Sequence, residues 1–304
     1  MSTNWTPAKI GDQRGRVAVI TGANTGLGLE TARELARAGA QVILAVRDEA
    51  RGEAAAKDIT SEIGHALVTV EQLDLGSLAS ILSAADRITA AHERIDLLIN
   101  NAGVMYVEHG LTENGYETHM GVNHLGHFAL TGLLLPKMID VADSRVVTVS
   151  SMGHRVPTSF DFDDPGGADK YNRVLAYSRS KLANLLFTYE LQRRLSAAKA
   201  STIAVAAHPG ASDTELARNS PAIVQRLAKV AEPVLQSAAE GAWPTLLAAV
   251  DSEARGGDYY GPGGKGEIRG HPKKVSSSKR SHDRNLQEEL WKFSEEATYV
   301  EFTV

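Results

Sequence analysis

Two side chains four residues apart could transfer a proton. Tyr177 and Lys181 stand in the stretch Tyr177-Ser-Arg-Ser-Lys181. On a helix, a four-residue step places both side chains on one face. The lysine ammonium would then favour the phenolate, so we expect Lys181 to lower the pKa of Tyr177 from its ordinary value of about 10. Such a tyrosine is a proton donor that works near neutral pH.

A glycine-rich turn precedes this pair in the chain, Thr21-Gly22-Ala-Asn-Thr-Gly26-Leu-Gly28. It follows a predicted strand, 17–21, and opens a predicted helix, 27–38. Gly22, Gly26 and Gly28 would let the backbone turn sharply and approach a pyrophosphate closely. The helix N-terminus then offers amide donors and a positive dipole to the anion. A glycine-rich loop that binds nothing is the alternative.

Apolar runs and helical patterns alternate along the chain and predict the elements that position these residues. This alternation indicates an α/β fold, a doubly wound parallel sheet of the Rossmann type with about seven strands, which binds ligands at the carboxyl ends of its strands. The expected strands are 17–21, 41–46, 66–73, 95–100, 145–150, 201–208 and 258–260. The expected helices are 27–38, 49–63, 77–92, 113–138, 173–198, 216–230 and 239–250.

Length and patterning predict one domain with a C-terminal addition. The chain has 304 residues, 43% of them hydrophobic and 23% charged, which is an ordinary globular balance. We expect an oxidoreductase domain over 1–260, with substrate-binding segments at 152–176 and 211–240. The 261–304 segment is basic and serine-rich in part, and we expect a solvated tail or an edge cover with a short helix at 283–296. A basic nucleic-acid or membrane arm is the alternative.

Composition excludes several classes of protein. The formal net charge is -5 and the sequence pI is near 6.1, so nucleic acid is not an expected partner. The chain has no cysteine, which excludes disulfides, thiolate nucleophiles and Cys-ligated zinc. It has no apolar run long enough for a signal peptide or a membrane span. We therefore expect a cytoplasmic protein with no membrane span.

A serine pair closes the predicted strand 145–150 and should lie beside the cofactor. Either Ser150 or Ser151 could cap the next segment, and resemblance to a known family, not the residues alone, favours Ser151 as the hydrogen-bond donor to a substrate oxygen. A hydrolase would place its serine in Gly-x-Ser-x-Gly, which is absent around these residues. His154, although close in sequence, does not suggest a nucleophilic serine.

The end of the second predicted strand bears on the choice of cofactor. Arg47 follows Val46, and a guanidinium can bind a 2′-phosphate through two hydrogen bonds. This favours NADP(H). Asp48 is adjacent and an acid there would suit the ribose hydroxyls of NAD(H), which remains possible. Arg47 as a solvated cation is the third interpretation.

Together these motifs resemble the short-chain dehydrogenase/reductase superfamily over residues 15–255. The resemblance rests on the Gly-x3-Gly-x-Gly turn, on Asn100-Asn101-Ala102-Gly103, on the Tyr177 and Lys181 pair, and on His208-Pro209-Gly210. It implies a catalytic set of Asn123, Ser151, Tyr177 and Lys181. It also implies cofactor contacts from Gly22, Asn24, Thr25, Gly26, Leu27, Gly28, Asp74, Leu75, Asn101, Ala102, Gly103, Tyr177, Lys181, Pro209, Gly210 and Thr214, to which the strand-end argument adds Arg47.

The resemblance also implies a role for individual residues. Asp74 would hold the adenine amino group, Asn101 would steady the fold near the cofactor, and Thr214 would bond the nicotinamide carboxamide. Lys181 would bond the nicotinamide ribose. Asn123 would hold a water in the proton relay, whereas from the residues alone an asparagine in a helical stretch is more often a local cap or kink.

Within the superfamily the chain is most similar to the branch of retinol dehydrogenases, WW-domain oxidoreductases and light-dependent protochlorophyllide reductases. The supporting stretches include Val46-Arg-Asp48 and Asn123-His-Leu-Gly-His-Phe128. The chain departs from this branch in having no hydrophobic N-terminal anchor and no cysteine. These departures argue against a membrane location, a retinoid substrate and a photoreductase. By family analogy, helices 113–138 and 173–198 are candidate surfaces of a homo-oligomer.

The sequence therefore predicts an NADP-dependent oxidoreductase that transfers a hydride between nicotinamide and a carbonyl or alcohol. The hydrophobic residues of 152–176 and 211–240, among them Phe160 and Phe162, favour an apolar small-molecule substrate, although they could equally be core or interface residues. An NADP-binding redox sensor or scaffold without turnover is the alternative, and an extended-type epimerase or dehydratase ranks last. We expect no metal site, with His124 and His127 as structural histidines.

Overall fold

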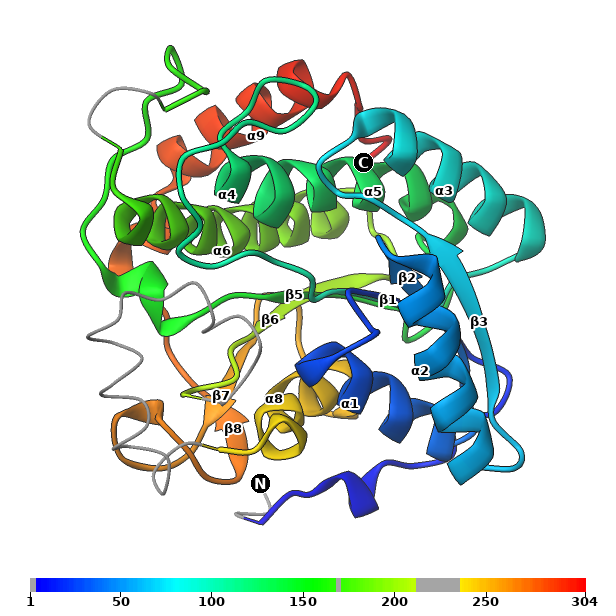
Figure 1. Cartoon of the computed structure of the whole chain (residues 1–304). Helices are drawn as coiled ribbons and strands as arrows, with labels where there is room; N and C mark the ends of the chain where they lie inside the picture. The colour runs from blue at the N-terminus through cyan, green and yellow to red at the C-terminus, as the bar shows by residue number, and fades with distance from the viewer. Residues whose placement is uncertain (1–3, 168–170, 212–235) are drawn as a thin grey trace.

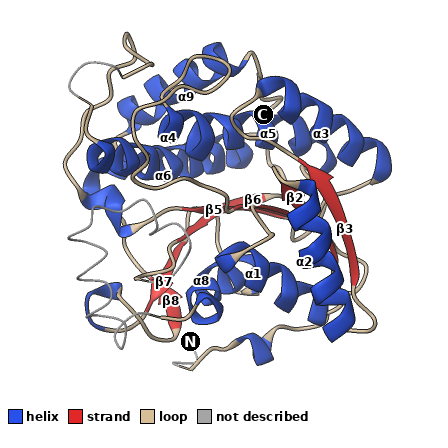
Figure 2. Ribbon diagram, viewed as in Figure 1, coloured by secondary structure: helices blue, strands red, loops and turns tan. Residues whose placement is uncertain are grey.

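The computed structural model describes residues 4–167, 171–211 and 236–304, and these form a mostly parallel sheet between two layers of helices (Figures 1 and 2). The strand order is β3-β2-β1-β4-β5-β6-β7-β8, and only the β7–β8 pair is antiparallel. The order reverses between β1 and β4, which is where a doubly wound sheet opens a crevice at its carboxyl edge. The strands are β1 (Val17–Thr21), β2 (Gln41–Val46), β3 (Leu67–Gln72), β4 (Leu97–Asn100), β5 (Arg145–Val149), β6 (Ile203–Ala207), β7 (Tyr259–Pro262) and β8 (Pro272–Lys274).

The central strands are apolar throughout because helices cover both of their faces. Val19 of β1 packs in a core cluster with α3 and α5, whereas the next residue, Ile20, packs with α1, α2 and α8. Both residues are fully buried. The helices are α1 (Gly26–Arg37), α2 (Glu49–Glu62), α3 (Leu78–Ala91), α4 (Thr118–Met120), α5 (Gly126–Leu134), α6 (Arg173–Ala197), α8 (Ala238–Val250) and α9 (Arg284–Thr298).

These elements confirm the predicted fold class, and most predicted boundaries agree with the structure to within three residues. The main exception is the single helix predicted over 113–138. The chain forms a turn closed by a bridge between Leu111 and Glu117, then α4, a π-helical turn η2 (Gly121–Leu125), and α5. Pro136 lies in a short 3₁₀ turn, Leu135–Lys137, that follows α5. The predicted helix 216–230 and Thr214 lie outside the described residues.

The C-terminal segment extends the sheet and the helical layer. β8 pairs with β7 and covers its edge, so the sheet has one strand more than the seven predicted. α9 lies on α5 and α6 (Figure 1), and Trp291 of α9 is only 2% exposed. The Trp291 ring lies 5.0 Å from the ring of Phe128 of α5 and 4.6 Å from that of Phe302. This part of the segment is therefore core, which the sequence did not indicate. None of the helices in the described residues is long and apolar enough to cross a membrane.

Candidate functional site

A cleft of about 410 Å³ opens at the carboxyl ends of β1, β2 and β4. Its lining brings together most of the residues predicted from motifs that lie far apart in the sequence. The predicted residues that line it are Gly22, Asn24, Thr25, Gly26, Leu27, Gly28, Arg47, Asp74, Leu75, Asn101, Ala102, Gly103, Tyr177, Lys181 and Pro209. Asn123, Ser151 and Gly210 are not part of this lining, and Thr214 lies outside the described residues.

The glycine turn is packed so closely that it leaves no room for a side chain at Gly28. A Cβ atom at Gly28 would lie 2.5 Å from Asn101 Nδ2 and 2.5 Å from Gly22 O. Gly22 itself has a φ of +64°, in the left-handed region that favours glycine. α1 begins at Gly26, so its first amides point out of the turn with no partner within the helix. These features fit a pyrophosphate at the start of α1.

The Asn101 side chain ties the glycine turn to the end of β4. Its Nδ2 donates to Thr21 O at 2.8 Å, and the backbone amides of Asn101 and Ala102 both donate to Thr21 Oγ1 at 2.9 Å. β1 and β4 are neighbouring strands. These bonds hold the two loops that flank the cleft at a fixed separation.

Charged residues at the end of β2 lie at one side of the cleft. Arg47, Asp48 and Arg51 all line it. Asp48 is the N-cap of α2, and its carboxylate accepts a hydrogen bond from the backbone N–H of Arg51 at 3.1 Å. Sequence reasoning missed Arg51. The signal was available, because an Asp at a helix N-cap places the residue three positions later in the first turn.

Tyr177 and Lys181 both lie on the first half of α6 and are almost completely buried. Lys181 Nζ lies 5.8 Å from the centroid of the Tyr177 ring and donates to Val149 O at 3.1 Å. Burial raises the pKa of Tyr177 to about 12, and a hydrogen bond with Ser151 offsets part of this rise. The predicted lowering of the Tyr177 pKa by Lys181 is therefore wrong for this structure. Burial also lowers the pKa of Lys181 to about 8.

The two serines at the end of β5 have different partners. Ser150 Oγ is buried and donates to Lys181 O at 2.8 Å. Ser151 is the N-cap of a short 3₁₀ turn, η4 (Met152–Arg155), and its Oγ accepts from Gly153 N at 3.1 Å. A Cβ atom at Gly153 would lie 3.3 Å from Tyr177 Cε1 and 3.6 Å from Ser151 Oγ. Ser150 is thus engaged with the backbone of α6, and Ser151 lies beside the tyrosine.

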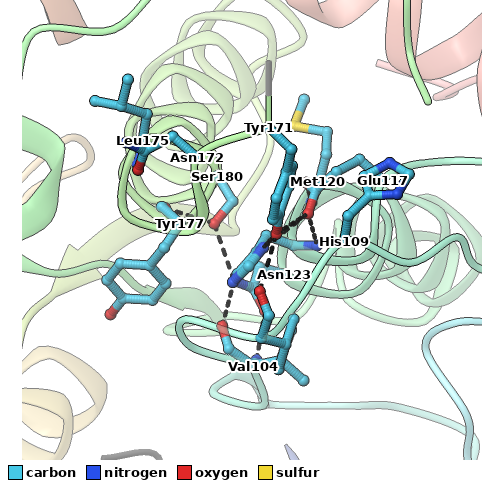
Figure 3. Close-up of polar contacts among 12 residues, drawn as sticks. Val104, His109, Glu117, Met120, Asn123, Tyr171, Asn172, Leu175, Tyr177 and Ser180 are labelled. Carbon is cyan, nitrogen blue, oxygen red and sulfur yellow. Dashed lines mark hydrogen bonds and ion pairs between the residues drawn. The ribbon is translucent and has the colours of Figure 1, made fainter. Parts of the chain in front are cut away.

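Asn123 lies within η2 and is fully buried (Figure 3). Its Oδ1 accepts from Val104 N at 2.7 Å, and its Nδ2 donates to Val104 O at 3.0 Å and to Ser180 Oγ at 2.9 Å. A Cβ atom at Gly103 would lie 3.0 Å from Asn123 Oδ1 and 3.5 Å from Lys181 Nζ. Asn123 and Lys181 therefore both lie next to Gly103.

A buried polar cluster outside the predicted set lies next to this group. Glu117 caps α4 by accepting from the backbone amides of His119 and Met120 at 2.9 and 3.0 Å. The His119 Nδ1 atom and the Tyr171 hydroxyl lie 2.7 and 3.2 Å from the same carboxylate. The His119 ring of this cluster lies edge to face with the Tyr177 ring, with ring centroids 6.2 Å apart. Sequence reasoning missed this cluster as well, because Tyr171 lies 54 positions from Glu117 and 52 from His119 in the chain.

His124 and His127 both hydrogen-bond within the fold. His124 Nε2 lies 2.8 Å from Ser294 Oγ of α9, and His127 bonds Thr21 Oγ1 at 2.8 Å and Asn123 O at 3.0 Å. Burial lowers the pKa of His124 to about 3 and that of His127 to about 4. Both are structural histidines, as predicted.

The aromatic residues predicted for substrate binding are placed differently. Phe160 and Phe162 stack on each other with ring centroids 5.5 Å apart, and Phe162 contacts Phe293 of α9 at 5.1 Å. Both are half-buried and pack against a core cluster that includes Met120 and Leu290, in line with the core alternative that the sequence left open. The rings that contact Tyr177 are those of Tyr106 and His119, both edge to face, with centroid distances of 5.2 and 6.2 Å.

Comparison with known proteins gives the same family throughout. The family model described as short chain dehydrogenase matches residues 16–223. Retinol dehydrogenase 12 of Homo sapiens is 42% identical over 282 residues, covering 92% of this chain and 85% of that protein. Polyprenol dehydrogenase of Mus musculus is 40% identical over 296 residues, covering 95% and 85%.

A solved structure matches this fold over nearly the whole chain. The crystal structure of an uncharacterised protein from Mycobacterium paratuberculosis is 45% identical, with a TM-score of 0.83, and covers 99% of this chain and 100% of that one. The glycine turn, the Tyr177 and Lys181 pair and these comparisons lead to one assignment. The chain belongs to the short-chain dehydrogenase family, a family of nicotinamide-dependent oxidoreductases, and to its retinol dehydrogenase-like branch.

Proposed function

We propose that this protein is an NADP-dependent oxidoreductase that interconverts a carbonyl and an alcohol on an apolar small molecule. The observation that carries the proposal is the position of Tyr177 and Lys181 on the same cleft as the glycine turn. A bound nicotinamide supplies or accepts the hydride at the carbonyl carbon. The residues of the chain must then donate or accept a proton and stabilise the negative charge on the oxygen.

In the direction of reduction, Tyr177 donates its proton to the substrate oxygen. The raised pKa of Tyr177 keeps the phenol protonated at neutral pH, so the proton is available when negative charge develops on that oxygen. Ser151 donates a hydrogen bond to the same oxygen, which its position beside Tyr177 supports. Lys181, charged below about pH 8, lies over the Tyr177 ring and bonds the nicotinamide ribose when the cofactor is bound.

We assign Asn123 to the relay that returns a proton to Tyr177. The support for this assignment is positional. Asn123 donates to Ser180 Oγ, which donates to the backbone carbonyl of Tyr177 at 2.8 Å, so these bonds position α6 and do not reach the phenol hydroxyl. Asn123 Oδ1 and Lys181 Nζ also lie next to Gly103. Asn123 thereby connects the floor of the cleft to the helix that carries the proton donor.

The preference for NADP(H) rests on the charges at the end of β2. Arg47 and Arg51 line the cleft there, and the Asp48 carboxylate is turned to the N-terminus of α2. Two guanidinium groups suit a 2′-phosphate, and an acid engaged as a helix cap is less free to bond ribose hydroxyls. NAD(H) binding would be weaker but is compatible with the same site.

The apolar substrate class rests on the walls near Tyr177. Tyr106, Val104 and Met105 lie there, and Val104 and Met105 line the cleft. The relatives are named for retinol and polyprenol, which are long apolar primary alcohols. We therefore place long-chain aldehydes and alcohols first among candidate substrates, ahead of sugars and phosphate esters.

The experiment is NADPH and NADH oxidation by the purified protein with retinal, aliphatic aldehydes, ketones and quinones, run beside Tyr177→Phe. Loss of the phenolic proton should lower kcat by at least about 10²-fold, because general-acid catalysis contributes on this scale. Cofactor binding, measured by fluorescence titration, should stay within about twofold. Tyr299→Phe is the matched control, since Tyr299 is exposed and does not line the cleft.

Two results would count against the proposal. Equal turnover by the wild type and Tyr177→Phe would remove Tyr177 as the proton donor. Tight NADPH binding by both proteins with no turnover of any substrate would favour the alternative, a redox sensor or scaffold that binds the cofactor without chemistry.

A further inference from the structure

The serine-rich stretch after β8 contacts the turn that carries Ser151. In Figure 1 this stretch is part of the orange segment that leads from β8 to α9. Ser278 precedes a short 3₁₀ turn, η8 (Lys279–His282), and its backbone N–H donates to His154 Nε2 at 3.1 Å. His154 belongs to η4, the turn that begins immediately after Ser151. The contact joins residues 124 positions apart in the chain.

The Ser278 contact determines which ring nitrogen of His154 carries the proton. A backbone N–H can only donate, so His154 Nε2 must accept and cannot itself be protonated. The proton of the neutral ring then lies on Nδ1, which is 2.6 Å from Ser151 O and donates to it. His154 is only 2% exposed, and burial lowers its pKa, so the ring is neutral at pH 7. Both nitrogens therefore have a partner.

Ser151 O also accepts the backbone N–H of His154 at 3.1 Å, so two bonds from one residue hold this carbonyl. Ser151 has extended backbone angles, whereas the next residue starts η4. The backbone that His154 holds carries the Ser151 hydroxyl, which lies beside Tyr177, since a Cβ atom at Gly153 would lie 3.3 Å from Tyr177 Cε1 and 3.6 Å from Ser151 Oγ. A residue that fixes this peptide therefore acts on the hydrogen bond that Ser151 offers to a substrate oxygen.

A second set of contacts holds the same C-terminal segment against the cofactor side of the site. Arg155 Nη2 donates to Ser276 O at 2.9 Å and to both carboxylate oxygens of Glu267 at 3.0 Å. Gly210 N donates to His208 Nδ1 at 3.2 Å, so the neutral His208 ring carries its proton on Nε2 and donates to Glu267 Oε2 at 3.1 Å. The segment thus contacts the loops after both β5 and β6.

We propose that His154 is a positioning residue through which the backbone of Ser278 orients Ser151 for the reaction. The inference rests on the proposed role of Ser151 and adds a function for the serine-rich segment. Its physical basis is the chain of two hydrogen bonds from Ser278 N–H to His154 and from His154 to Ser151 O. Displacement of a substrate-binding hydroxyl by about 1 Å can cost orders of magnitude in rate.

Substitution of Ser278 by proline removes the N–H donor and puts the ring Cδ in place of the hydrogen that faces His154 Nε2, so the bond is lost and the His154 ring must shift. Ser278 has a φ of -66° and a ψ of 151°, which proline adopts without strain. Ser278→Ala is the matched control, because it keeps the N–H and removes only the hydroxyl. That hydroxyl is buried and has no hydrogen-bond partner among the described residues.

We expect Ser278→Pro to lower kcat by about tenfold and to leave the NADPH dissociation constant within about twofold. Ser278→Ala should match the wild type in both. A merely structural defect would instead reduce cofactor affinity and the unfolding midpoint together with kcat. Equal kcat for the proline and alanine variants, with Tyr177→Phe inactive, would overturn the inference alone. An active Tyr177→Phe would instead overturn the proposed function.

Two further measurements decide the question if Ser278→Pro does not fold. Ring ¹⁵N NMR of the wild type should show His154 as the neutral tautomer with the proton on Nδ1, and a cationic or Nε2-protonated ring at pH 7 would contradict the inference. His154→Leu removes both bonds and should lower kcat with little change in cofactor affinity. Wild-type kcat in His154→Leu would also contradict it.

Discussion

At the scale of single residues, Tyr177 and Lys181 interact through the ring face and not through the hydroxyl. The ammonium lies 5.8 Å from the ring centroid, and the dominant influence on both side chains is burial. Burial disfavours the charged form of each group, so it raises the pKa of the phenol and lowers that of the amine. The tyrosine therefore holds its proton at neutral pH, which suits proton donation during reduction.

Arg47 provides a residue-scale prediction about cofactor choice. Arg47→Asp should lower the ratio of NADPH to NADH affinity by at least about tenfold, because it removes a charge-assisted hydrogen bond and places an anion near the 2′-phosphate. Fluorescence titration with both cofactors measures the ratio.

Lys57→Asp is the matched control for this prediction. It makes the same change of charge on α2 at an exposed residue that does not line the cleft. If the ratio of NADPH to NADH affinity does not change in Arg47→Asp, or changes equally in both variants, Arg47 does not bind the 2′-phosphate.

At the scale of elements, the short helices between β4 and β5 depend on one buried carboxylate. Glu117 accepts two backbone amides at the start of α4 and also bonds His119 and Tyr171. Gly126 N donates to Gly121 O, which is the five-residue step of a π-helix and rotates Asn123 relative to a regular helix. The position of Asn123 therefore depends on the Glu117 cap at the start of α4 and on the π-helical step in η2.

Glu117→Gln should destabilise the protein by about 2–4 kcal/mol, since a neutral amide cannot accept from every donor that surrounds the carboxylate and leaves one of them buried without a partner. Urea unfolding measures the change. Glu113→Gln, an exposed carboxylate in the preceding turn, should leave the free energy of unfolding within about 0.5 kcal/mol. Similar unfolding midpoints for the two variants would argue that Glu117 is not needed to hold α4.

At the scale of the whole molecule, buried neutral histidines connect distant parts of the chain. His124 bonds α9, His127 bonds β1, and His208 bonds Glu267 in the C-terminal segment. Burial lowers their pKa values to about 3, 4 and 4 respectively. Burial opposes protonation of all three rings, so they stay neutral in the folded protein above about pH 4.

This arrangement predicts a loss of stability in mild acid. Each histidine has a pKa near 6.5 when unfolded, so between pH 6.5 and about 4 the unfolded state binds more protons than the folded state. The free energy of unfolding should therefore fall with decreasing pH in this window, by up to about 1.4 kcal/mol per pH unit for each histidine.

Urea unfolding at pH 7, 6 and 5 measures the slope of the free energy of unfolding against pH. His127→Gln should reduce this slope by the contribution of one histidine. His65→Gln should leave the slope unchanged, because His65 is exposed. A stability that stays constant between pH 7 and pH 5 would contradict the prediction, since carboxylates titrate mainly below this range.

The sequence by itself determined the features that follow from local spacing. Apolar strands alternating with helices predict the parallel sheet. A sheet of this type collects its loops at one edge, so the motifs alone place Gly22, Asn101 and Tyr177 at one site. The four-residue step between Tyr177 and Lys181 could likewise be predicted, because helix geometry depends only on neighbours in the chain.

Only the tertiary structure decided what depends on contacts between distant residues. The direction of the Tyr177 pKa shift depends on how completely other elements bury the ring. The partners of Ser150 and Ser151 depend on α6 and η4, and the role of Ser278 depends on a contact with His154. Burial and hydrogen bonds of this kind arise from the packing of segments far apart in the chain, which periodicity and spacing do not encode.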